Sequence, residues 1–257
     1  MPRRAAIGLM TLATLGALWW LVTMPLELIS PGRFPSPADV WASARQVATR
    51  GYANGLLHQH VLHSLKLVLL GFVVAAGFGA PLGLLMGWSR RAEALINPVF
   101  SLIRPIPPLA WIPLAILWLG LGDAAKIFVI WFAAFVPAVI NSFAGVRAIE
   151  PHTLEAARML GTPRWRFIAE VLIPGAAPMI FTGLRLSLQA SWTTLVAAEL
   201  VGALYGLGRV LNVAQQDIYP GMIFVGMAVV AALGWITTRI LAQIETWSLP
   251  WVQMARA

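Results

Sequence analysis

Glu155-Ala156-Ala157-Arg158-Met159-Leu160-Gly161 lies in a short charged segment, residues 147–170, between two long apolar runs. Pro151 can begin a helix, and Gly161 can end one because glycine accepts the left-handed conformation of a helix cap. Thr162-Pro163 can begin a second helix, with Thr162 as the cap and Pro163 in the first turn. The segment therefore predicts a helix, a turn and a second helix outside the membrane.

The first of these predicted helices has a modest apolar stripe. Leu154, Ala157 and Leu160 recur every three residues, and the small residues Ala156 and Ala157 leave a low surface that can sit in a groove of another protein. By themselves these features predict an amphipathic helix, and docking to a partner is one of the uses of such a helix.

The composition places the rest of the chain in a membrane. Of 257 residues, 59% are hydrophobic and 11% are charged, whereas a soluble domain carries about 25% charged residues. The apolar residues form runs of about 20 residues, long enough to cross a bilayer as helices. We predict an all-α membrane protein with six transmembrane helices, at about residues 7–24, 62–88, 95–121, 124–146, 175–201 and 220–241.

The distribution of basic residues predicts the orientation. The net charge is +8, from 18 basic and 10 acidic residues, and topology explains this excess better than nucleic-acid binding. With both termini in the cytoplasm, ten basic residues lie inside and six outside, which favours that orientation; the two sets are Arg3, Arg4, Arg90, Arg91, Arg147, Arg158, Arg164, Arg166, Arg239 and Arg256 against Arg33, Arg45, Arg50, Lys66, Lys126 and Arg209.

Three regions follow from these runs. Residues 1–60 hold the first span, retained because no small-residue cleavage site follows it, and an extracytoplasmic amphipathic segment. Ser36-Pro37-Ala38-Asp39 predicts the start of that amphipathic helix, which we expect on the membrane surface with Val40, Ala44 and Val47 on one side. Residues 61–245 form the core, and residues 246–257 a cytoplasmic tail.

Two of the predicted spans have unusual features. Gly79, Gly83 and Gly87 recur every four residues in the second span and predict close approach of another helix. The third span contains four prolines between Pro105 and Pro113, which one regular helix cannot accommodate. Irregular backbone at this depth is tolerated in contact with protein or a water-filled cavity. We expect a broken helix beside a translocation path, the alternative being a kink that only shapes packing.

Ionisable and aromatic residues inside the spans are candidates for that path. Arg185, Trp192 and Glu199 lie at seven-residue steps and hence along one stripe of the fifth span. Arg185 and Glu199 are about 21 Å apart on a straight helix, so each needs another partner. We hypothesise that Arg185 and Arg104 attract an anion, that Trp192 packs against its carbon chain, and that Glu199 lies nearer the outer gate; the remaining candidates are Trp111 and Gln189. The alternative is packing and interfacial anchoring.

Catalytic and metal sites have little support. The chain has no cysteine, and no pair of aspartates lies within the predicted spans, which argues against an intramembrane enzyme. His58, His60 and His63 have irregular spacing and no acid nearby, so we expect loop residues rather than metal ligands.

The charged segment resembles a known motif. Glu155-Ala-Ala, three residues, Gly161, nine residues and then Val171-x-Ile173-Pro174 is similar to the cytoplasmic loop that docks membrane subunits of ABC importers onto their ATPases. The resemblance assigns docking to Glu155, Ala156, Ala157, Arg158 and Gly161. Valine and isoleucine replace the isoleucine and leucine usual at the two apolar positions, a conservative difference.

The resemblance extends over about residues 60–245. The proline-rich segment that begins at Arg104, Gly120-Leu-Gly122-Asp123 and the segment Ser191 to Glu199 look like permeases for taurine, alkanesulfonates and nitrate, the taurine permeases most of all. This implies a type I ABC importer permease in the bacterial inner membrane. Such a subunit is a homodimer in lipid, with two cytoplasmic ATP-binding subunits and an extracytoplasmic binding protein.

The sequence agrees that ATP is hydrolysed elsewhere. A phosphate-binding loop needs Gly-Lys-Ser/Thr, and the only lysines, Lys66 and Lys126, follow Leu65 and Ala125. We therefore expect no catalytic residue, cofactor or metal in this chain, with ATP and Mg bound by the partner ATPase. Nitrate or a pyrimidine precursor of thiamine is the alternative substrate, and an ion-coupled secondary transporter the alternative class.

Overall fold

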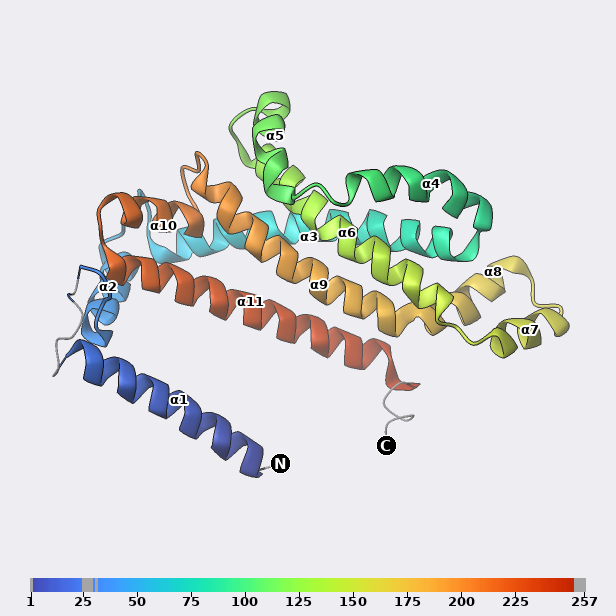
Figure 1. Ribbon diagram of the computed structural model, residues 1–257, viewed down its shortest axis with the longest axis horizontal. Coiled ribbons are helices and arrows are strands. Elements are labelled where there is room, and N and C mark those ends of the chain that lie inside the picture. Colours follow the sequence, from blue (N-terminus) through green and yellow to red (C-terminus); the bar gives the residue numbers. More distant parts are fainter. Residues whose placement is uncertain (1, 25–29, 31, 252–257) are drawn as a thin grey trace. The chain divides into compact units, whose positions relative to one another are not determined.

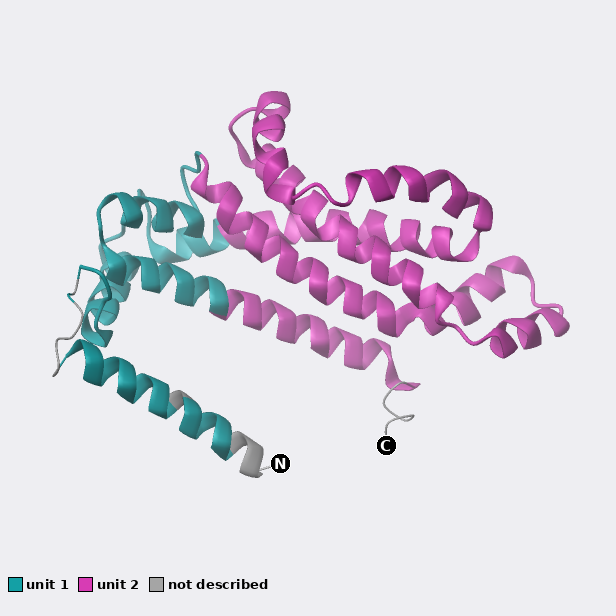
Figure 2. Ribbon diagram, viewed as in Figure 1, with its two compact units in different colours: residues 1–63, 202–231 teal, residues 64–201, 232–257 magenta. Residues whose placement is uncertain are grey.

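The computed structural model describes residues 2–24, 30 and 32–251, with only the backbone for residues 2–5 and 12. Arg256 and the side chains of Arg3 and Arg4, used above to predict orientation, lie outside that description. In the described part all regular structure is helical, apart from an isolated bridge between Tyr52 and Gly55. The chain forms two compact units, residues 1–63 with 202–231 and residues 64–201 with 232–257 (Figure 2).

The prediction of an all-α protein with six spans is confirmed. Five of the described helices are long and apolar enough to cross a membrane, and a sixth span arises if a bent pair of helices counts as one. The helices along the chain (Figure 1) are α1 (Pro2–Thr23), α2 (Pro37–Thr49), α3 (Leu57–Trp88), α4 (Arg90–Ile103), η1 (Pro108–Trp111), α5 (Ile112–Leu119), α6 (Asp123–Arg147), α7 (Pro151–Met159), α8 (Arg164–Arg166), η2 (Phe167–Leu172), α9 (Ile173–Leu200), α10 (Leu207–Gln216) and α11 (Pro220–Ser248).

In the first unit, α2 begins as predicted. The Ser36 side chain accepts a hydrogen bond from the Asp39 backbone N–H, and the Asp39 carboxylate accepts one from the Ser36 backbone, which completes a capping box. The side of α2 that carries Val40, Ala44 and Val47 packs against protein. Val47 is fully buried against residues of α10 and α11, because those helices offer their own apolar faces; the cluster contains Val47, Ala53, Val210, Ala214, Met222 and Val225.

The histidines lie on the first two turns of α3, not in a loop as expected. His60 is fully buried within the first unit. Its Nδ1 accepts a hydrogen bond from the backbone N–H of Gly206 at 3.1 Å, and its Nε2 lies 3.0 Å from the carbonyl oxygen of Tyr52. Because Nδ1 accepts, Nε2 carries the proton and donates to Tyr52. His60 therefore joins three segments of the first unit.

A second polar contact in this unit joins Tyr52 to Asp217. The Tyr52 hydroxyl donates to the Asp217 carboxylate at 2.6 Å. Burial, together with this hydrogen bond to a negative group, raises the pKa of the Tyr52 hydroxyl above its ordinary value. The contact fixes the loop before α3 to the end of α10.

In the second unit, the glycines of α3 allow close contact with α6. A Cβ at Gly83 would lie 2.4 Å from the carbonyl oxygen of Val139, and one at Gly87 2.6 Å from the Cβ of Val146. Gly79 makes a similar approach to Ala138. The predicted close packing of these glycines is therefore confirmed, and its partner is α6.

Helix α6 also makes close contacts with α9. Cβ atoms at Gly145 and Gly183 would lie 2.9 Å from the Ala176 carbonyl oxygen and 2.6 Å from the Asn141 Cβ. The Ser187 hydroxyl donates to the carbonyl oxygen of Ala134 at 2.6 Å. Small residues and one buried hydrogen bond thus hold α6 close to both neighbours.

The proline-rich third span is broken, as predicted. Helix α4 ends at Ile103, and η1 with α5 resumes at Pro108 after a bend of 84°. Pro107 lies in the gap and Pro108 is the first residue of η1. Neither position needs a backbone N–H for a helical hydrogen bond. The second half packs on the start of α6 through a cluster built around Ala115, Ala125 and Val129.

We expect Gly83→Ala to destabilise the protein by about 1–3 kcal/mol, because the added methyl group would meet the backbone of α6. The measurement is the midpoint of thermal unfolding in detergent, followed by size-exclusion chromatography. Gly77→Ala is the matched control, since Gly77 lies on the same helix and a Cβ added there would have no atom within 4 Å. Equal shifts for both variants would contradict the close approach.

Candidate docking segment and translocation path

The segment of residues 147–170 contains a short helix with a well-defined end. Helix α7 has Pro151 in its first turn and is followed by Gly161 at φ +66°. The N–H of Gly161 donates to the carbonyl of Arg158 at 3.0 Å, and the N–H of Thr162 donates to that of Ala157 at 3.2 Å. These are the two hydrogen bonds of a Schellman motif, so the predicted glycine cap is confirmed.

The inner face of α7 packs onto the helix that follows it. Ala157 is buried in a cluster with Phe167, Leu172 and Ala176, and Leu154 is packed against the cluster. The expectation that Ala157 lies on the outer surface is therefore wrong. Its small side chain instead lets α7 approach the following helix, and Ala156 is the exposed member of the alanine pair.

The outer end of α7 is apolar and exposed. Met159 and Leu160 are 90% and 84% exposed, and Trp165 is 64% exposed. Leu160 was expected to extend the apolar stripe, but it lies beyond the last residue of α7, where it turns outward. Glu155 and Arg158 are also exposed. Charged side chains and an apolar end on one small helix form a surface suited to binding another protein.

The second predicted helix of this segment is not a separate element. Pro163, not Thr162, occupies the N-cap of α8, and no side-chain hydrogen bond caps it. The backbone continues from α8 through the π-helix η2 into α9, and residues Arg164–Leu200 form one candidate span of 37 residues. Figure 1 shows α7 and α8 at the ends of α6 and α9 that lie away from α5.

Two of the predicted path residues on α9 contact the last part of α11. The Arg185 guanidinium pairs with the Glu245 carboxylate through two nitrogens, at 3.0 and 3.4 Å. The buried Trp192 donates its Nε1–H to the Thr237 hydroxyl at 3.0 Å. Arg185 is too far from Glu199 to pair with it, as predicted. It pairs with Glu245 instead, which compensates its charge.

Glu199, the third member of the stripe, is fully buried. Both of its carboxylate oxygens accept from the Ser64 hydroxyl, at 2.8 and 3.0 Å. Gln189, the remaining candidate on α9, is exposed. The stripe of α9 therefore faces two different helices along its length, α11 at Arg185 and Trp192, and α3 at Glu199.

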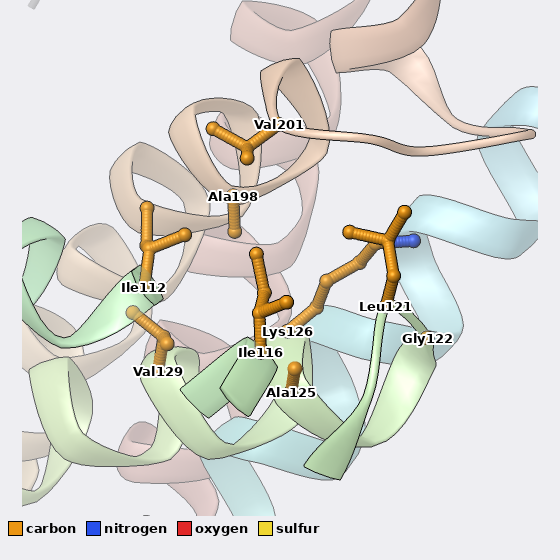
Figure 3. Close-up of a pocket in the computed structure, with 9 residues that line it drawn as sticks. All are labelled: Ile112, Ile116, Leu121, Gly122, Ala125, Lys126, Val129, Ala198 and Val201. Carbon is orange, nitrogen blue, oxygen red and sulfur yellow. The ribbon is translucent and has the colours of Figure 1, made fainter. Parts of the chain in front are cut away.

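The residues predicted at the break lie against α6. Arg104 is exposed immediately after α4, and the Trp111 ring is 4.8 Å from that of Phe132. A small pocket is lined by α5, α6 and the end of α9 (Figure 3). Its polar lining residue is Lys126, which is buried and lies 3.5 Å from Asp123.

The structure thus does not gather all path candidates into one site. Within the second unit they form three groups, at the break, along α11 and at Ser64. Sequence reasoning missed the partners Ser64, Thr237 and Glu245, because ordinary serine, threonine and glutamate residues carry no local signal. Spacing is a hint to these pairs. Thr237 and Glu245 are eight residues apart on α11, and their partners Trp192 and Arg185 are seven residues apart on α9.

The long apolar helices, the broken span and the helical segment at one end define a multi-pass membrane permease. The family described as "Binding-protein-dependent transport system inner membrane component" matches residues 79–250. The chain belongs to this family. It is a permease subunit of an ABC importer in the inner membrane and is not itself the ATPase; a system of this kind implies an ATPase and a binding protein as partners.

Individual relatives support the same assignment. The chain is 36% identical over 252 residues to the taurine transport system permease protein TauC of Escherichia coli, covering 98% of this chain and 91% of TauC. It is 33% identical to a putative aliphatic sulfonates permease, SsuC of Bacillus subtilis, over 95% and 87% of the two chains. A bicarbonate permease, CmpB of Synechococcus elongatus, is 33% identical over 84% and 81%.

Solved structures show the same fold. An inward-facing structure of the MetNI methionine ABC transporter matches with a TM-score of 0.61 and 21% identity, covering 76% of this chain and 95% of the other. An amino acid ABC transporter matches with a TM-score of 0.56 and 20% identity, over 76% and 92%. The fold class predicted from the sequence is therefore confirmed.

We expect Gly161→Ala to loosen the end of α7, because a left-handed conformation costs alanine about 1–2 kcal/mol. Hydrogen exchange of residues 151–163, followed by mass spectrometry, should accelerate about tenfold. Gly122→Ala makes the same chemical change at a glycine with extended backbone and no nearby atoms, and should leave the segment unaffected. Unchanged exchange in Gly161→Ala would show that the cap does not hold α7.

Proposed function

We propose that this permease pairs with a second copy of itself to form a path for a small organic anion, first of all taurine or another sulfonate. A separate cytoplasmic ATPase, which binds ATP and Mg, would dock on α7 of each copy, and an extracytoplasmic protein would deliver the anion. Both termini would lie in the cytoplasm, as the basic residues predict.

The observation that carries the proposed docking is the exposed end of α7, whose inner face packs on the continuous helix formed by α8, η2 and α9. Glu155, Arg158 and the apolar end offer a charged and apolar surface, while the buried Ala157 fixes the inner face of α7 to η2 and α9. A force applied by an ATPase to α7 would therefore reach α9 directly. Since α9 carries Arg185, Trp192 and Glu199, this connection links ATP hydrolysis to the candidate path.

The proposed substrate class rests on charge and on the relatives. Arg104 and Arg185 are basic residues within candidate spans, where an ionisable group is expected to face protein or water. The relatives with named substrates transport taurine, aliphatic sulfonates and bicarbonate, and all of these are anionic or carry an anionic group. Nitrate and a pyrimidine precursor of thiamine are the alternatives.

Glu155→Arg should release the ATPase from the complex. Reversing a charge at a docked surface places like charges together, and we expect binding to weaken at least about tenfold. The test is co-purification in detergent of a cytoplasmic ATPase with this permease, together with the ATPase activity of the eluate. Arg33→Glu, a charge reversal at an exposed residue of the other unit, is the control, and equal ATPase recovery with Glu155→Arg would refute the docking role.

Taurine uptake by reconstituted complexes tests the role of Arg185. We expect Arg185→Ala to reduce uptake about tenfold or more, because a hydrogen-bonded cation for the anion is lost. Glu245→Gln is the matched control, since it breaks the same ion pair but keeps the cation, and should retain most of the uptake. If the two variants lose uptake equally, Arg185 acts only through its ion pair.

A further inference from the structure

The polar residues of α4 (Figure 1) lie along one side of that helix. They are three or four residues apart, a spacing that places them on a single stripe of an α-helix. The stripe consists of Arg90, Glu93, Asn97, Ser101 and, directly after the helix, Arg104. From residue 92 to residue 103 all the other residues are apolar. Helix α4 is therefore amphipathic, although it belongs to a candidate membrane span.

Contacts with α6 show how deep in the span this stripe extends. Glu93 near the start of α4 pairs with Arg147 at the end of α6, and the ring of Phe100 lies 6.4 Å from that of Phe135. Phe135 is the middle residue of the 25 in α6, about 18 Å from Arg147 along the helix axis. Ser101 follows Phe100, so the stripe reaches the middle of the membrane.

The polar side of α4 is not covered by the described part of the chain. No residue of α4 is buried, and Asn97, Ser101 and Arg104 are exposed. The Ser101 hydroxyl donates to the side-chain carbonyl of Asn97 at 3.2 Å. Pro98 has no N–H to donate to the carbonyl oxygen of Ala94, as a regular helix would. Ala94 lies three residues before Asn97, on the same side of α4, so a backbone acceptor adds to the polar groups there.

Lipid does not supply partners for these groups. Hydrocarbon offers no hydrogen bonds, and an arginine within a span faces protein or water. If the stripes of two copies packed directly on each other, two-fold symmetry would place Arg104 beside a second Arg104 at the same depth. Like charges in direct contact repel each other. This favours water along the stripe over direct packing of the two copies.

Resting on the proposed function, we infer that the polar side of α4 lines the water-filled cytoplasmic half of the transport path. The path runs from Arg90 at the docking end of the span to Ser101 at its middle. Its entrance lies at the docking end because Glu93 pairs with Arg147, the last residue of α6 before α7. Asn97 and Ser101 are the residues that offer hydrogen bonds to a hydrophilic solute on this half of the path.

Single cysteines test this inference, because the chain contains none. Asn97→Cys and Ser101→Cys place a thiol on the polar side of α4. Leu95→Cys and Leu102→Cys are matched controls on its apolar side, where the two leucines are 76% and 77% exposed in the single chain. The permease–ATPase complex in inverted membrane vesicles, which expose the cytoplasmic face, is treated with the membrane-impermeant 2-sulfonatoethyl methanethiosulfonate. We expect the polar-side thiols to react at least about tenfold faster than the controls, because the charged reagent does not enter hydrocarbon.

Three results would overturn the inference. These are equal labelling rates on the two sides of α4, labelling of Asn97→Cys only from the outer face in spheroplasts, and an unreactive Ser101→Cys that forms a disulfide with the second copy. The last result would make the stripe a contact between copies. Labelling after denaturation in dodecyl sulfate shows that each thiol is present, and co-purified ATPase shows that each complex is intact.

Blocking the stripe tests whether the water along it belongs to the path. We expect Ser101→Cys labelled before reconstitution to lose ATP-driven taurine uptake that the unlabelled variant performs. Arg33→Cys, at an exposed position of the other unit, should keep its uptake after the same labelling. Uptake unchanged by complete labelling of Ser101→Cys would also overturn the inference. Docking of the ATPase is measured by co-purification whatever the labelling shows, so failure here leaves the proposed function standing.

Discussion

The close contact of α6 with α3 and α9 is the interaction on which the second unit depends. Apolar side chains gain little by leaving lipid for protein, so helices in a bilayer associate through close packing and hydrogen bonds. Gly83 brings α3 against the backbone of α6, and Gly145 with Gly183 does the same between α6 and α9. Because α6 is held from both sides, it can support the broken third span, which packs on it through α5 and η1.

Lipid supplies no hydrogen-bond partners, so the polar side chains of this unit lie where another helix supplies one. Glu199 accepts from Ser64, Arg185 pairs with Glu245, and Trp192 donates to Thr237. Each contact joins α9 to another helix, so α9 carries most of the polar contacts between helices in the described part of this unit. Since α9 is also continuous with η2 and α8, a movement at the docking segment would act on all three contacts.

Much of the fold was predictable because its signals are local. Runs of apolar residues marked the spans, the prolines after Arg104 marked the break, and Gly161 marked the end of α7. Errors arose where a neighbour in space decided the outcome. His60 is a buried helical residue whose two ring nitrogens meet Tyr52 and Gly206, and Ala157 is buried because α7 folds back onto η2. The sequence around His60 and the sequence around Ala157 do not indicate these contacts.

The sequence by itself determined the class of protein, the number of spans, the break and the charged helical segment of residues 147–170, because each depends on hydropathy, on backbone restrictions of proline and glycine, or on a motif within twenty residues. Only the tertiary structure decided which charges are compensated and which are open. Arg104 and Arg185 look alike in the sequence, as single basic residues within spans. Arg185 has Glu245 within 3.0 Å, whereas Arg104 is exposed immediately after α4, because the pairing of a charge depends on which distant helix packs beside it.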